Sequence, residues 1–170
     1  MNTGRTRRTI WTLLAVPAAV ATLLLTGAPA AQAMPPSSGS WDVPPNDFVD
    51  PDVCAYLGIV VTGTEWESAS WQINWNKDGT FKEGFVHHKL HVIVHANGKT
   101  MYEDDTWTEL FRNGTLTQVG NLTHEQMDGA NIVQDAGMVV LDADGNIVRV
   151  TGRHPTLNGL GMCPFFLPTT

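Results

Sequence analysis

Basic residues are scarce in this chain of 170 residues, where 10 lysines and arginines stand against 17 aspartates and glutamates. Three of the ten, Arg5, Arg7 and Arg8, lie at the extreme N-terminus. Without them, 7 basic and 17 acidic residues remain, a formal net charge of −10. A surface this acidic repels phosphate backbones and anionic lipid headgroups. We therefore expect no nucleic-acid partner and no electrostatic docking on an acidic membrane.

Long apolar runs are also missing. The apolar run over residues 11–25 is shorter than the about 20 residues that a membrane-spanning helix needs, and it contains Pro17. It follows the three arginines and leads into Ala31-Gln32-Ala33, an A-x-A cleavage site. The order of charge, apolar run and small residues predicts a signal peptide over residues 1–33, cleaved near Ala33. We expect a secreted, extracellular protein with no permanent membrane anchor.

The chain lacks the short sequence motifs that identify common catalytic and cofactor-binding sites. It has no G-x-S-x-G elbow, no H-E-x-x-H, no phosphate-binding loop and no dinucleotide-binding glycine pattern. Residues 142–146 begin like a calcium loop, but Ile147 and Arg153 occupy the positions where an EF-hand needs glycine and glutamate. The acidic run over residues 103–105 is expected to be a solvated bend. We expect no cofactor and no metal, and the sequence leaves open whether the protein is an enzyme.

Cysteine is limited to Cys54 and Cys163. An even count in an exported protein favours a disulfide, because thiols are not kept reduced outside the cell. The two residues frame the region expected to fold. We predict a structural Cys54–Cys163 bridge, with a catalytic thiol as the alternative.

Helical periodicity is absent as well, and turn signals replace it. Residues 34–53 contain five prolines and predict a disordered linker. Asn-Gly and Asp-Gly pairs, which tight hairpins favour, then recur at short spacing. They lie at residues 76–79, 97–98, 113–114, 128–129 and 142–146, between β-branched and aromatic runs at 56–62, 70–75, 85–96, 138–141 and 147–151. This spacing predicts a single all-β domain over residues 54–170, an antiparallel meander closed as a small barrel or folded as a β-sandwich.

The layout resembles a group of uncharacterised small secreted proteins of actinobacteria, and more faintly the allene-oxide-cyclase and dirigent barrels. The resemblance rests on the Pro-rich start, Asp52-Val53-Cys54, the strand entry at residues 77–81, the late hairpin at 136–148 and Cys163. It implies a closed barrel rather than a sandwich. It transfers no catalytic residue, because none matches position by position.

Two groups of side chains are weak candidates for ligand binding. His87, His91 and His95 share one face of a predicted strand, about 13 Å apart at ~3.3 Å per residue, which is too far for two of them to bind one metal ion. We expect them on the wetter face, with His88 on the core face. Trp71 and Trp75 point the same way and form core, with a ligand-cavity wall or a platform for stacking sugar rings as the alternatives.

These observations favour a secreted, non-catalytic binding or surface-interaction module that holds a small, partly apolar ligand in a barrel cavity or contacts an extracellular protein. A cyclase- or isomerase-type enzyme using such a cavity is the alternative.

Overall fold

Seven antiparallel strands in sequence order form one sheet in the computed structural model, which describes residues 34–159 and 161–168. The strands are β1 (Ser37–Cys54), β2 (Ile59–Trp75), β3 (Phe81–Ala96), β4 (Lys99–Arg112), β5 (Thr115–Met127), β6 (Ala130–Leu141) and β7 (Ile147–Arg153). Short 3₁₀ turns complete the fold: η3 (Ala55–Leu57), η4 (Thr156–Asn158) and η5 (Cys163–Phe166). The all-β meander is therefore confirmed. The predicted signal peptide lies outside the described residues.

The predicted turns lie between the strands. Asn97, Asn113 and Asp128 have positive φ angles of 50–52° and each precedes a glycine that also has positive φ. Because this backbone conformation is strained for other residues, the Asn-Gly and Asp-Gly pairs determine where the hairpins turn. At residues 128–129, β5 and β6 meet directly in such a turn.

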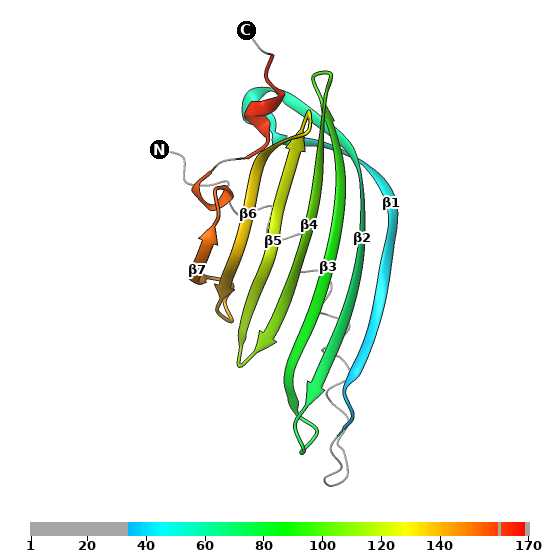
Figure 1. Cartoon of the computed structure of the whole chain (residues 1–170), viewed down its shortest axis with the longest axis vertical. Helices are drawn as coiled ribbons and strands as arrows, with labels where there is room; N and C mark the ends of the chain where they lie inside the picture. The colour runs from blue at the N-terminus through cyan, green and yellow to red at the C-terminus, as the bar shows by residue number, and fades with distance from the viewer. Residues whose placement is uncertain (1–33, 160, 169–170) are drawn as a thin grey trace.

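Two features of the predicted architecture are wrong. The sheet is not closed into a barrel, and β1 and β7 form its two free edges (Figure 1). The segment predicted as a disordered linker is mostly β1, which pairs with β2 from Ser37↔Ile73 to Cys54↔Ile59. Breaks in this pairing fall at Val43/Asn46, around Pro44 and Pro45, and at Asp50/Cys54, around Pro51. Proline is tolerated there because an edge strand leaves alternate N–H groups unpaired.

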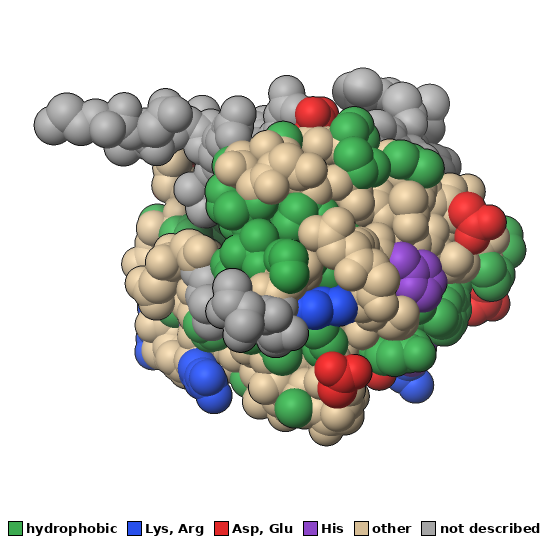
Figure 2. Space-filling view, turned by 90° about the horizontal axis from the view of Figure 1, so that it is seen from above, with side chains coloured by type: hydrophobic (Ala, Val, Ile, Leu, Met, Phe, Trp, Pro, Cys, Tyr) green, Lys and Arg blue, Asp and Glu red, His purple; other side chains and the backbone are tan. Residues whose placement is uncertain are grey.

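The sheet is bowed (Figure 1). One of its faces, here called the inner face, carries every buried residue of the described strands. Its apolar core lies at the disulfide end of the sheet. The core contains Cys54, Ile59, Val61, Val92, Val94, Ala96, Met101, Met127, Cys163 and Phe166. Seen from this end, the surface shows many apolar side chains (Figure 2). Among the described residues, no helix is long and apolar enough to cross a membrane.

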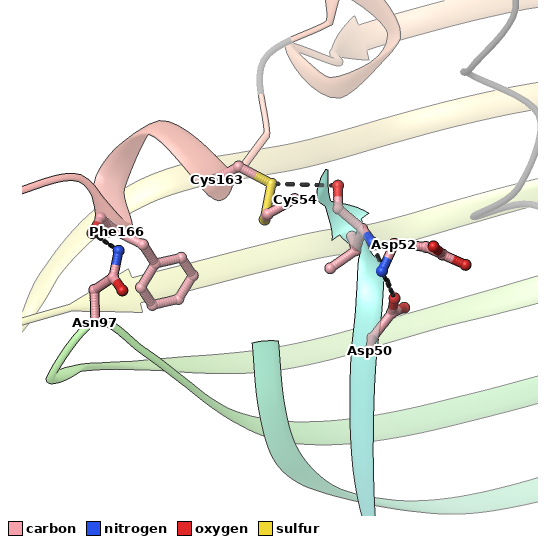
Figure 3. Close-up of a disulfide and its surroundings, with 7 residues drawn as sticks. Asp50, Asp52, Cys54, Asn97, Cys163 and Phe166 are labelled. Atoms are coloured by element: carbon pink, nitrogen blue, oxygen red, sulfur yellow. Dashed lines mark hydrogen bonds between the residues drawn. A yellow bond between two sulfur atoms is a disulfide. The ribbon is translucent and has the colours of Figure 1, made fainter. Parts of the chain in front are cut away.

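The predicted disulfide is present, and it joins the end of β1 to η5. Its sulfur atoms are 2.05 Å apart, and both cysteines are buried (Figure 3). Two kinds of contact anchor the C-terminal segment over the sheet. Phe166 is fully buried beside the disulfide, and Asn97 and Lys99 donate hydrogen bonds to backbone carbonyls of this segment. A disulfide fits an extracellular protein.

Candidate functional site

His88 lies at the centre of the inner face, where β2, β3 and β4 align Ala69, His88 and Trp107. His88 is 6% exposed, and its imidazole stacks on the Trp107 indole, with ring centroids 4.4 Å apart and planes 5° apart. Trp41 of β1 meets the same ring edge-on at 6.0 Å. The two indoles hold the imidazole in one orientation.

Two carboxylates contact the two nitrogens of this ring. His88 Nδ1 lies 2.6 Å from Glu67 Oε1, and Nε2 lies 3.7 Å from Glu109 Oε2. The longer contact is an ion pair and not a hydrogen bond, so within the described residues Nε2 has no hydrogen-bond partner. Burial by itself would lower the pKa of His88, but its interactions with Glu109 and Glu67 raise the pKa to about 9. His88 is therefore an imidazolium at neutral pH.

Glu109 is positioned by three neighbours. Gln118 Nε2 donates to Glu109 Oε1 at 3.0 Å and Trp107 Nε1 donates to the same atom at 3.5 Å. Burial favours the protonated acid, yet the interactions with His88 and Gln118 outweigh it and lower the pKa of Glu109. The imidazolium of His88 and the ionised Glu109 thus form a buried ion pair.

A second set of carboxyl groups lies between His88 and the apolar core. Glu103 of β4 is directly opposite Glu125 of β5, and Asp105 is the next inner-face residue of β4. Asp135 of β6 pairs with Thr123, two positions from Glu125. We call Glu103, Asp105, Glu125 and Asp135 the acidic layer. Three of its members are 4–7% exposed: Asp105, Glu125 and Asp135.

Burial dominates the electrostatics of the acidic layer. It raises the pKa of Asp105 to about 9, with a further contribution from Glu103, and the pKa of Glu125 to about 8. The pKa of Glu103 is raised as well, mainly by burial. The His124 N–H donates to Asp105 Oδ1 at 2.7 Å, which only partly offsets the penalty. At neutral pH, Asp105 and Glu125 therefore hold protons that a solvated carboxylate would release.

The three predicted histidine candidates lie on the outer face and are not brought together. Each contacts a different β4 residue: His87 contacts Thr108 at 3.1 Å, His91 contacts Asp104 at 2.5 Å and His95 contacts Thr100 at 3.0 Å. His91 also stacks on Trp66, with centroids 5.3 Å apart. Successive side chains of a strand point to opposite faces of the sheet. The prediction that His88 faces the core, while His87, His91 and His95 do not, is therefore confirmed.

The two tryptophan candidates have different surroundings. Trp71 is half-buried on the inner face, and its indole covers Gly39 of β1 so closely that a Cβ there would lie 2.8 Å from the ring. Its position is two residues from Ala69, the neighbour of His88. Trp75 instead donates to Ser37 Oγ at 3.3 Å and packs edge-on against Phe81. Of the two, Trp71 is the one adjacent to the His88 site.

Sequence reasoning missed the acidic layer. The prediction that residues 103–105 form a solvated bend is wrong, since all three lie inside β4. The signal was the alternation of β4: Met101, Glu103, Asp105, Trp107 and Glu109 share one parity. Two large apolar residues in that series identify its face as the buried one, and they place the carboxyl groups on it.

Two hollows of the surface lie away from these groups. One of about 460 Å³ is lined by Val60, Thr62 and residues 95–100, and another of about 480 Å³ lies between Lys99, Ile132 and Phe165. Neither of the two includes His88 or a member of the acidic layer. The site described above lies on one face of an open sheet.

Within the described part of the chain, no three His, Cys, Asp or Glu side chains are arranged to hold a metal ion. Comparison with family models, with curated proteins and with solved structures finds no match. The chemistry of the inner face is therefore the basis for a functional assignment.

Proposed function

We propose that this protein is an extracellular, non-catalytic binding module that holds a small, partly apolar ligand against the inner face of its sheet. The observation that carries the proposal is the His88 site. Aromatic walls there surround a buried nitrogen, Nε2, that has no hydrogen-bond partner within the described residues. Buried polar atoms are normally paired, and an exception is a candidate ligand contact.

The composition of this face supports the same reading. Ligand sites are lined mainly by apolar and aromatic side chains, with a few polar groups that orient the ligand. Trp41, Trp71 and Trp107 supply the aromatic surface here, and His88 with its two carboxylates supplies the polar groups.

Native mass spectrometry of protein secreted by its own host tests this proposal. We expect an adduct of small mass on the wild-type protein and its loss in Trp71→Ala. The matched control is Trp66→Ala, because Trp66 is a half-buried tryptophan of the same strand that lies on the outer face. Thermal melting of both variants shows that they fold. No adduct on the wild type, or equal loss in both variants, contradicts the proposal.

A cyclase- or isomerase-type enzyme is the second candidate. It is favoured by His88, whose raised pKa of about 9 makes it a proton donor at Nε2 toward a bound molecule. The recovered ligand separates the two candidates. A binding module returns it unchanged, whereas an enzyme converts it during incubation.

A further inference from the structure

The acidic layer brings together four carboxyl groups from three strands. Glu103 and Glu125 are directly opposite each other, and side chains at such positions have Cβ atoms about 4.5–5.5 Å apart. Like charges at this distance destabilise a sheet. Asp105 and Asp135 extend the layer by one inner-face position toward His88.

In the described part of the chain, no basic side chain is placed to balance these carboxyl groups when they ionise. None of its lysines or arginines is buried, and half-buried Lys99 donates to the carbonyl oxygens of Phe165 and Leu167. The nearest imidazolium, His88, already contacts Glu67 and Glu109. A buried carboxylate needs a proton, a cation or several hydrogen bonds.

Hydrogen bonding satisfies only part of the layer. Asp135 accepts from the backbone N–H and the hydroxyl of Thr156, and Asp105 accepts from the His124 N–H. Glu125 is 7% exposed, and its Oε2 has no hydrogen-bond partner among the described residues. This buried, unpaired oxygen is a second observation, beside the clustering of the carboxyl groups, that a hydrogen-bond donor on a ligand would account for.

The walls beside the layer are apolar. Met101 and Met127 continue β4 and β5 toward the disulfide end, and Val133 lies opposite Glu125 on β6; these three are 0–8% exposed. A hydrated metal ion gains nothing from such walls, whereas an organic cation places its carbon skeleton against them.

We propose that the ligand of the inner face is a small organic cation, a protonated amine or a guanidinium on an apolar body. Its charge is received by Glu103, Asp105, Glu125 and Asp135, and its body lies against the adjoining apolar and aromatic side chains. This inference rests on the proposed binding function and specifies the chemical class of its ligand.

Cation binding at this layer has a proton signature. The titratable groups that face the layer are its own four carboxyl groups from β4, β5 and β6, His88 with Glu109 and Glu67 from the neighbouring strands, and His154 beyond β7. Asp105 and Glu125 hold protons at neutral pH, so an arriving cation of single charge displaces about one of them. Affinity for the cation therefore rises as the pH increases from 6 to 9.

Titration calorimetry with 2-phenylethylamine and agmatine tests the inference, with 2-phenylethanol as the neutral analogue of the first. We expect at least one amine to bind with release of about one proton, measured in two buffers of different ionisation enthalpy. We expect the alcohol to bind about tenfold more weakly or not at all.

Two isosteric variants of adjoining strands complete the experiment. Glu125→Gln removes a carboxyl group that ionises when the cation displaces its proton, and it should weaken amine binding by about tenfold. Asp104→Asn removes an exposed carboxylate between Glu103 and Asp105 that points to the outer face, and it should leave the affinity within about twofold.

The outcomes separate this inference from the proposed function. Equal binding of amine and alcohol, or equal effects of the two variants, overturns the inference of a cationic ligand, while the proposed binding function stands. Failure of both amines to bind also overturns the inference of a cationic ligand. A mass spectrum that identifies the adduct as a neutral molecule overturns it as well. Absence of any adduct on the secreted protein contradicts the proposed function itself.

Discussion

Two carboxyl groups of the inner face, Glu109 and Glu125, differ in protonation state because their nearest charged neighbours differ. Glu109 lies beside the imidazolium of His88 and stays ionised, whereas Glu125 has only carboxyl groups as charged neighbours and is protonated at neutral pH. The two residues have the same chemistry and lie on adjacent strands. Their protonation states differ because they occupy different positions on the inner face.

The pH dependence of stability follows from these shifts. The pKa of His88 is about 9 in the folded protein and about 6.5 in the unfolded chain, so its contribution is complete below pH 6.5 and is lost as the pH rises through 9. For Glu125 the folded pKa of about 8 exceeds the unfolded value of about 4.3, so the folded state binds an extra proton between these limits. Both groups make the free energy of unfolding fall as the pH rises from 6.5 to 8.

Glu125→Gln should therefore stabilise the ligand-free protein at pH 8 by roughly 1–3 kcal/mol and have a much smaller effect at pH 5. The amide retains the shape of the protonated acid and cannot ionise. Urea unfolding of both proteins at the two pH values measures the difference. Equal destabilisation at both pH values would show that the ionised carboxylate of Glu125 is stabilised in the fold.

At the scale of elements, a row of glycines crosses three strands next to Trp107. Gly120, Gly137 and Gly152 are aligned across β5, β6 and β7, with φ angles of 141°, 141° and 102°. A Cβ on Gly137 would lie 2.1 Å from the Thr151 carbonyl oxygen and 2.8 Å from the Gly152 Cα. Glycine at such positions lets a sheet bend, and this row coincides with the level of His88.

Gly137→Ala should consequently cost about 2–4 kcal/mol of unfolding free energy, because backbone and not a flexible side chain occupies the space. The control is Gly161→Ala. No atom lies within 4 Å of its added Cβ, and its change should stay within about 0.5 kcal/mol. Chemical unfolding measures both. A loss below 0.5 kcal/mol in the first variant would mean that the strands separate here without penalty.

At the scale of the whole molecule, the two ends of the meander are joined by covalent and side-chain contacts and not by a hydrogen-bonded seam. The Cys54–Cys163 bridge spans 109 residues and connects β1 to η5 (Figure 3). The same segment is held at the disulfide end by buried Phe166 and by hydrogen bonds that Lys99 and Asn97 donate. The opposite end of the sheet has no such link among the described residues.

Replacing both cysteines with serine should lower the free energy of unfolding by about 2–5 kcal/mol, since the bridge restricts a long loop of the unfolded chain. Equilibrium unfolding of the double variant, beside the wild type with and without reductant, measures the loss. A difference below 1 kcal/mol would indicate that η5 and Phe166 hold the end of the sheet without the bridge.

The positions of the hairpins and the disulfide could be predicted from sequence because they depend on local or nearly unique signals. Asn97-Gly98 and its counterparts require positive φ angles, and only one pairing of two cysteines exists. β1 was missed because its prolines indicate a linker, and they are compatible with a strand only when that strand is an edge. Whether a strand is an edge is not encoded within the strand itself.

The sequence by itself determined that this is a meander of β-hairpins with one covalent link, because turns and alternation act over a few residues. Only the tertiary structure decided that the sheet stays open and that Glu67, His88 and Glu109 meet while His87, His91 and His95 do not. The physical reason is register. The groups of the inner face come from different strands, and strand pairing determines which side chains become neighbours in the same buried layer.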